Sequence, residues 1–207
     1  MLHESRWFAG LSVLAYFGLT LAFPLALSRA AQVDERPAMT SHEFEIAFPK
    51  VMGWIEQTLS AHAQIARPLA SMHFRRLPLY FSQAQIEAAK FVVVDRLPLP
   101  LLSSIGLSRF KEFERDDYGG VTFLDTYFLT RASADNESLH FHEMVHVVQW
   151  RVLGPERFLA MYASGLEAFG YRNNPLEKMA YDAQELFDRS GPVFDAEKFV
   201  TDKLSGL

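Results

Sequence analysis

The chain contains no cysteine among its 207 residues. A disulfide framework and a thiolate metal site are therefore excluded, and any metal ion must be held by histidine, aspartate or glutamate. Long basic runs are also missing, and the net charge is −5 at pH 7. We expect no nucleic-acid partner, because proteins that bind nucleic acids present clustered lysine and arginine to the phosphates.

Charge is absent from one long stretch near the N-terminus. Residues 7–27 contain no Asp, Glu, Lys or Arg, and a stretch of this length can span a bilayer. It exceeds the apolar core of most signal peptides, yet the small residues just before Ala31 suit a signal peptidase. We expect residues 1–31 to be a signal peptide or a membrane anchor. The alternative is a buried N-terminal helix of the soluble fold.

This segment sets an expectation for the rest of the chain. Residues 32–207 are long enough for one domain with a sizeable core. If residues 1–31 direct the chain to the membrane, that domain is exported (periplasmic or extracellular) or is membrane-anchored and faces the extracytoplasmic side.

Residues 142–146 read His-Glu-Met-Val-His. Histidines four apart share one face of a helix, so His142 and His146 can reach a single metal ion. Glu143 then points at a water molecule on that ion, which is the arrangement of zinc hydrolases: two histidine ligands, a general base and an open coordination position. The alternative is a pair of surface or core histidines beside a solvated glutamate. His140 lies on nearly the opposite face, so we interpret it as a surface or packing residue.

The flanking sequence predicts a helix around this motif. No glycine or proline interrupts residues 136–153. Asn136 and its neighbours offer N-cap side chains, and Gly154-Pro155 is typical of a helix end.

The remaining elements are predicted from periodicity and from turn residues. Residues 32–48 are polar and mixed, which indicates a linker. We expect helices over 49–66, 83–90, 155–169 and from about 174 to about 191, and strands over 91–94 and 121–130, the latter as one strand or a bent pair. This order predicts an α+β fold in which a small β-sheet packs on the metal-binding helix and further helices. The later strand could receive an extended peptide at its free edge, or it could be an ordinary core strand.

Catalytic zinc sites use three protein ligands, so a third ligand is needed. Glu177 lies at the start of a predicted helix. It is far enough from His146 along the chain for one helix to lead away from the metal and for the first turn of the next helix to return to it. Its alternative role is a capping box with Asn174 as the N-cap. Glu185, further along the same helix, is the second candidate for the third ligand.

Each of the other polar residues near Glu177 could have either a role in the site or a purely structural role. Tyr171 or Tyr181 could donate a hydrogen bond to a developing oxyanion, although such tyrosines are more typical of packing. Asp182 could orient a ligand histidine from behind, or it could be a solvated helix residue.

The segments HEMVHVVQW and YRNNPLEKMAYDAQ together resemble zincin metallopeptidases with a glutamate as third ligand, the gluzincin branch. Within it they look closest to bacterial families with an HExxH-VxQ helix. The resemblance covers about residues 91–188. It implies a zincin-like fold with Zn²⁺ as cofactor, His142, His146 and Glu177 as its ligands, and Glu143 as general base. The best-studied gluzincins have an asparagine directly before this glutamate and an aspartate four residues after it, whereas here Asn174 and Asp182 stand three before and five after.

We therefore expect a zinc-dependent hydrolase, a metallopeptidase that acts on a peptide or protein substrate. One alternative is a catalytically inactive zincin-like module for binding or assembly at the membrane. Another is a metal-dependent hydrolase of bonds other than peptide bonds. The intact Glu143 favours the two enzymes, because metal binding alone does not require that base.

Overall fold

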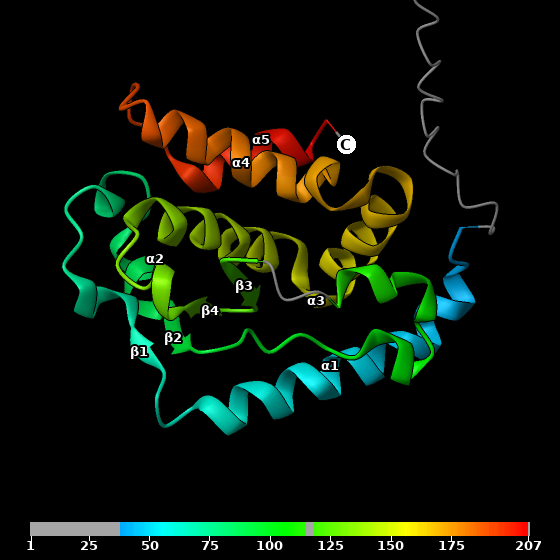
Figure 1. Ribbon diagram of the computed structural model, residues 1–207. Coiled ribbons are helices and arrows are strands. Elements are labelled where there is room, and N and C mark those ends of the chain that lie inside the picture. Colours follow the sequence, from blue (N-terminus) through cyan, green and yellow to red (C-terminus); the bar gives the residue numbers. More distant parts are fainter. Residues whose placement is uncertain (1–37, 115–117, 207) are drawn as a thin grey trace, which may run out of the picture. The chain divides into compact units, whose positions relative to one another are not determined.

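The computed structural model describes residues 38–114 and 118–206 (Figure 1). The signal peptide or anchor expected over residues 1–31 lies outside these ranges. Within them, no helix combines the length and the apolar character that crossing a membrane requires.

The α+β class is confirmed. The helices are α1 (Ser41–His62), α2 (Gln83–Ala88), α3 (Glu137–Asn173), α4 (Pro175–Asp188) and α5 (Ala196–Leu204), and the strands are β1 (Arg67–Pro68), β2 (Lys90–Val94), β3 (Gly120–Phe123) and β4 (Thr126–Thr130). Two 3₁₀ turns, η3 (Leu102–Ile105) and η4 (Ser108–Phe113), lie between β2 and β3.

The first helix begins earlier than predicted. The Thr40 side chain accepts the backbone N–H of Glu43, and Glu43 accepts the backbone N–H of Thr40 in return, which forms a capping box. Pro49, the expected start, lies inside the helix. The linker predicted over 32–48 is therefore wrong from Ser41 onward, because the capping signal at Thr40 outweighs the proline.

The sheet has the strand order β1-β2-β4-β3, with β2 and β4 parallel and the other pairs antiparallel. The strand predicted over 91–94 is confirmed within β2. The segment 121–130 forms a bent pair, β3 and β4, which turns at Leu124, where φ is 58°. Because β3 lies at the end of this order, it is an edge strand beside α3.

Alternation along the strands separates two apolar clusters. Phe91 and Tyr127 belong to the cluster that packs on α3, α4 and α5. Val92 and Phe128 belong to the cluster that contains Ile55 of α1. Figure 1 shows the result: α1 runs along one side of the sheet, and α3 and α4 lie on the other. The strands are therefore fixed from both faces.

Two glycines divide α3. Gly154 and Gly170 have φ of 72° and 70°, a left-handed region that favours glycine, and the helix axis changes direction at each. The helix end predicted at Gly154-Pro155 is confirmed as the first of these breaks. After the second break, Asn174 caps α4 by accepting the backbone N–H of Leu176 at 3.1 Å. The chain thereby turns back, and α4 packs along α3.

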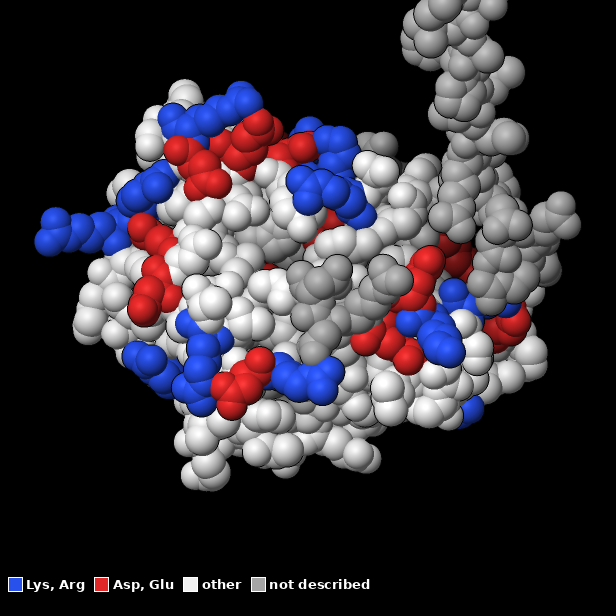
Figure 2. Space-filling view, viewed as in Figure 1, with Lys and Arg blue, Asp and Glu red and all other residues white. Residues whose placement is uncertain are grey.

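Charged side chains of both signs are interspersed over the face shown in Figure 2. Several are paired one turn apart on a helix, as Lys178 with Asp182 and Lys198 with Asp202. Exposed pairs of this kind contribute little to stability, because water and salt screen them. The stability of the fold therefore depends on its apolar clusters far more than on these surface charges.

Candidate metal centre

His142, His146 and Glu177 are brought together in one buried cluster. The two Nε2 atoms lie 3.1 Å apart, and each lies 3.5 Å from one carboxylate oxygen of Glu177. A tetrahedral zinc ion with bonds of about 2.0–2.1 Å separates its ligand atoms by roughly 3.3 Å. Each residue offers one ligand atom, and these three atoms lie within 4.8 Å of one another, close enough for one such ion to be bound after a small adjustment.

One oxygen in this cluster lacks a partner. The side chains of His142, His146 and Glu177 are almost fully buried. In the described part of the chain, Oε2 of Glu177 is the buried side-chain atom that makes no hydrogen bond. An unpaired buried carboxylate oxygen is costly, and a bound cation would satisfy it. The residues present thus fit a metal ion.

Gln149 fixes the tautomer of His146. Its side-chain Nε2 donates to the carbonyl of Leu176 at 2.9 Å, so its Oε1 must be the atom that faces Nδ1 of His146 at 2.8 Å. Nδ1 therefore carries the proton and donates it. The Nε2 lone pair of His146 is left to point into the cluster, as a metal ligand must.

Gln184 on α4 holds His142 in the same way. Its Oε1 lies 3.1 Å from Nδ1 of His142, and its Nε2 bonds to Ser138 at 2.9 Å. Asp182, the residue considered for this role, instead pairs with Lys178. With both Nδ1 atoms donating, the two Nε2 atoms face each other at 3.1 Å, and a shared proton or a bound cation between them would satisfy both.

The capping-box role considered for Glu177 is wrong. Asn174 is the N-cap of α4 and Pro175 its first residue, as predicted, but the carboxylate of Glu177 does not turn back to the Asn174 backbone. Its Oε1 accepts a hydrogen bond of 2.6 Å from the hydroxyl of Tyr162 on α3. Tyr162, which sequence reasoning did not identify, therefore aims Glu177 at the two histidines.

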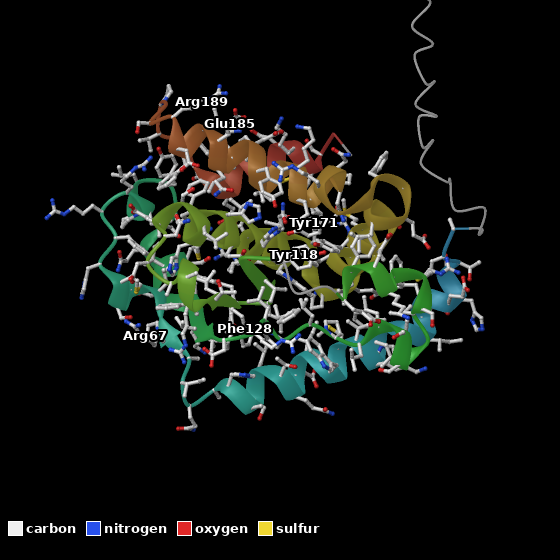
Figure 3. All side chains as sticks on the ribbon, viewed as in Figure 1. Arg67, Tyr118, Phe128, Tyr171, Glu185 and Arg189 are labelled. Atoms are coloured by element: carbon white, nitrogen blue, oxygen red, sulfur yellow. The ribbon has the colours of Figure 1, made fainter. Side chains whose placement is uncertain are left out.

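Glu185 is not brought to the cluster. It is exposed and pairs with Arg189 one turn along α4. Figure 3 shows both residues near the far end of α4, away from the central Tyr118 and Tyr171. Among the two candidates for third ligand, the geometry selects Glu177.

His140 does not contribute to the cluster, as expected, but it is a core residue and not a surface one. Its ring is buried and lies 2.6 Å from the hydroxyl of Tyr127 and 2.9 Å from the carbonyl of Ala134. Burial lowers the pKa of His140, so it is a neutral packing residue between the sheet and α3.

Glu143 is held by the edge strand. Its Oε2 accepts a hydrogen bond of 2.6 Å from the hydroxyl of Thr122, and a Cβ at Gly120 would lie 2.4 Å from its Oε1. Burial raises the pKa of Glu143 despite the opposing effect of the nearby histidines. A carboxylate in this setting accepts a proton more readily than one in water, which suits a general base.

The cluster favours positive charge. Burial opposes the charged forms of both Glu177 and His146, but their attraction is stronger. It holds the pKa of Glu177 well below its usual range and raises the pKa of His146 to about 9. Two buried carboxylates, those of Glu143 and Glu177, thus require a proton or a metal cation close by.

Two pockets reach the cluster and share part of their lining. One, of about 190 Å³, has almost entirely apolar walls and ends at His146 and Glu177; we call it the apolar pocket. The other, of about 270 Å³, includes His142 and Arg172; we call it the polar pocket. Four residues line both: Tyr118, Gly120, Glu143 and Tyr171. Figure 3 places Tyr118 and Tyr171 next to each other, and their rings lie 4.6 Å apart.

The edge of β3 is partly occupied. The indole N–H of Trp150 donates to the carbonyl oxygen of Thr122 at 3.2 Å. An extended peptide therefore meets an occupied acceptor at Thr122, and strand addition along this edge requires Trp150 to move. Of the two roles considered for this strand, packing within the core therefore describes β3 at Thr122 better than binding of a peptide at its free edge.

No family model, curated protein or solved structure matches this chain. The resemblance to gluzincins, and the zinc ion that it implies, therefore stay predictions that rest on the residues and on the geometry of the cluster.

We predict that Glu177→Ala lowers the affinity for zinc by more than about a hundredfold, because loss of a ligand costs more than the 10–100-fold typical of an outer partner. Metal content after dialysis and calorimetric titration measure it. Glu185→Ala is the matched control on the same helix and should bind one equivalent like the parent chain. Equal affinities in the two variants would show that Glu177 is not a ligand.

We predict that Gly120→Ala keeps the metal but misplaces Glu143. The added Cβ would lie 2.4 Å from the Glu143 Oε1 and 2.9 Å from a methyl carbon of Leu129, so the carboxylate must leave Thr122. If the chain is a hydrolase with Glu143 as its base, turnover should fall about a hundredfold, as for a misplacement of about 1 Å. Gly53→Ala is the control, since nothing lies within 4 Å of its added Cβ. Normal turnover by Gly120→Ala would contradict this account of Glu143.

Proposed function

We propose that this protein is a zinc-dependent hydrolase with a zincin-like fold that cleaves peptide bonds. The observation that carries the proposal is the convergence of Glu143 with the three cluster atoms of His142, His146 and Glu177. Three protein donors leave a tetrahedral ion one open position, which is how catalytic zinc sites differ from structural ones. Two imidazoles and one carboxylate suit zinc, although other divalent transition metals accept similar donors.

A zinc ion in this site would lower the pKa of bound water toward neutrality and polarise a carbonyl group. Glu143 would accept the proton of the attacking water, and its raised pKa assists this step. The same carboxyl group would then deliver the proton to the leaving amine. Thr122 would keep the carboxyl group in place through both transfers.

Tyr171 is the best-placed donor for the developing oxyanion. It lines both pockets together with Glu143. Burial, followed by the nearby Glu177 carboxylate, raises its pKa far above the usual value, so its hydroxyl stays protonated at neutral pH. Tyr181 also contacts His142, with ring centres 4.6 Å apart, but it lines only the polar pocket.

The expected role of residues 1–31 belongs to the same proposal. If they form a signal peptide or anchor, the peptidase acts on peptide or protein substrates outside the cytoplasm, or at the membrane surface that faces outward.

Glu143→Gln should retain zinc and the fold but lose hydrolysis, because the amide has nearly the same shape and cannot accept a proton. We expect a loss of about 10²–10⁴-fold, measured with casein and a peptide library, with and without a chelator. Unchanged turnover would show that Glu143 is not the base. Loss of zinc in this variant would show that Glu143 has a structural role, and chelator-resistant turnover by the parent chain would exclude a metal hydrolase.

Tyr171→Phe should lower kcat by about 10²–10³-fold, the usual cost of losing one oxyanion donor, with little change in KM. The ring and its contact with Tyr118 are kept and only the hydroxyl contact with Tyr181 is lost, so the melting temperature should change little and zinc content should stay unchanged. A fall in stability without a specific loss of kcat would instead support the packing role first considered for this tyrosine.

A further inference from the structure

We propose that the substrate is asymmetric about its scissile bond: a bulky apolar group binds on the His146 side, and a carboxylate binds on the His142 side, near Arg172. This inference rests on the proposed function and specifies its substrate class. The compounds that fit are peptides whose cleaved bond lies between a large apolar residue and a nearby free C-terminus.

Three walls of the apolar pocket are helix α1, the turns η3 and η4, and the segment of α3 after Gly154. Strand β3 and the earlier part of α3 complete its lining. The rings and aliphatic chains that face it include Phe48, Trp54, Leu107, Phe110, Phe158 and Leu166. At about 190 Å³, it is somewhat larger than the apolar cavity of about 150 Å³ that holds benzene. A phenyl ring or a branched aliphatic side chain therefore fits.

The walls of this pocket are tied together. Arg109, in η4, bonds to Glu167 of α3 at 2.6 Å and to Glu43 of α1 at 3.1 Å. The same Glu167 accepts the backbone N–H of Met39 at 2.9 Å. Because one arginine joins all three walls, the pocket is preformed and its capacity is limited.

The polar pocket carries a cation at its rim. The guanidinium of Arg172 lies over the ring of Tyr181, 4.9 Å from its centre, and Tyr181 in turn contacts the His142 ring. An arginine held by an aromatic ring next to a metal site is well suited to bind a carboxylate of the substrate.

The wall shared by the two pockets places the bond between them. A substrate that fills both must pass Glu143 and Tyr171, because these residues line both pockets. The apolar group and the carboxylate therefore occupy two different pockets that meet at the general base. Each end of the substrate then has its own pocket, so the direction in which the substrate binds is fixed before any catalytic step occurs.

The apolar half is tested with alkyl hydroxamates, which bind the metal and are not hydrolysed. Calorimetry with the zinc-loaded full chain would compare acetohydroxamate with longer homologues. We expect roughly fourfold tighter binding for each added methylene, from about 0.8 kcal/mol apiece, until the pocket is full. Ala163→Phe fills the pocket and should remove this gain, whereas Ser164→Phe, exposed on the next position of α3, should retain it.

The carboxylate half is tested with peptides bound to the zinc-loaded Glu143→Gln chain. A short peptide that ends in phenylalanylalanine is compared with its C-terminal amide. We expect the free acid to bind about tenfold more tightly, the effect of one charge-assisted contact. Arg172→Gln should abolish the difference, and Arg189→Gln, at the opposite end of α4, should leave it unchanged.

The results of these experiments distinguish a failure of the proposed function from a failure of the proposed substrate class. If acetohydroxamate fails to bind the zinc-loaded chain, the proposed function fails, and the substrate class fails with it. If acetohydroxamate binds but affinity does not rise with chain length, or Ala163→Phe behaves like Ser164→Phe, only the apolar assignment is overturned. A preference for the free acid that survives Arg172→Gln overturns the carboxylate assignment.

Discussion

The candidate metal centre depends on one electrostatic constraint: two imidazole Nε2 atoms and a carboxylate meet in a site from which water is almost excluded. Gln149 and Gln184 turn the Nε2 atoms of both histidines inward, 3.1 Å apart. Glu177 brings a negative charge to the same point, with one oxygen unpaired. Such a cluster is unfavourable without positive charge at its centre. Helices α3 and α4 supply these groups, and the edge strand β3 holds Glu143 beside them.

The return of the chain to the cluster depends on close packing between α3 and the start of α4. A Cβ at Gly165 would lie 2.6 Å from the side-chain oxygen of Asn174, so the two helices meet where no side chain can intervene. Asn174 uses this proximity fully: it donates to the Tyr162 carbonyl at 2.9 Å and caps the N-terminus of α4. Tyr162 then bonds Glu177. One buried asparagine thus links the cap to the position of a candidate ligand.

Local signals in the sequence were sufficient for the parts of the site that lie on one helix or at its ends. The His142–His146 spacing, the break at Gly154 and the N-cap at Asn174 each follow from neighbouring residues. Contacts between helices could not be predicted this way. Gln184 takes the role considered for Asp182, two residues away, because the rotation of α4 against α3 decides which side chain reaches His142. The start of α1 does not follow from Pro49, because the capping box of Thr40 and Glu43 begins the helix before the proline.

The neutral partners of the two histidines have a consequence for reactivity. A carboxylate behind a ligand imidazole makes the ring more basic and transfers electron density to the ion. Here both rings are oriented by glutamine amides, which fix direction without adding negative charge. A divalent ion would then face a single anionic ligand, Glu177, and would retain a net positive charge. It would act as a stronger electrophile than an ion whose histidines are backed by carboxylates.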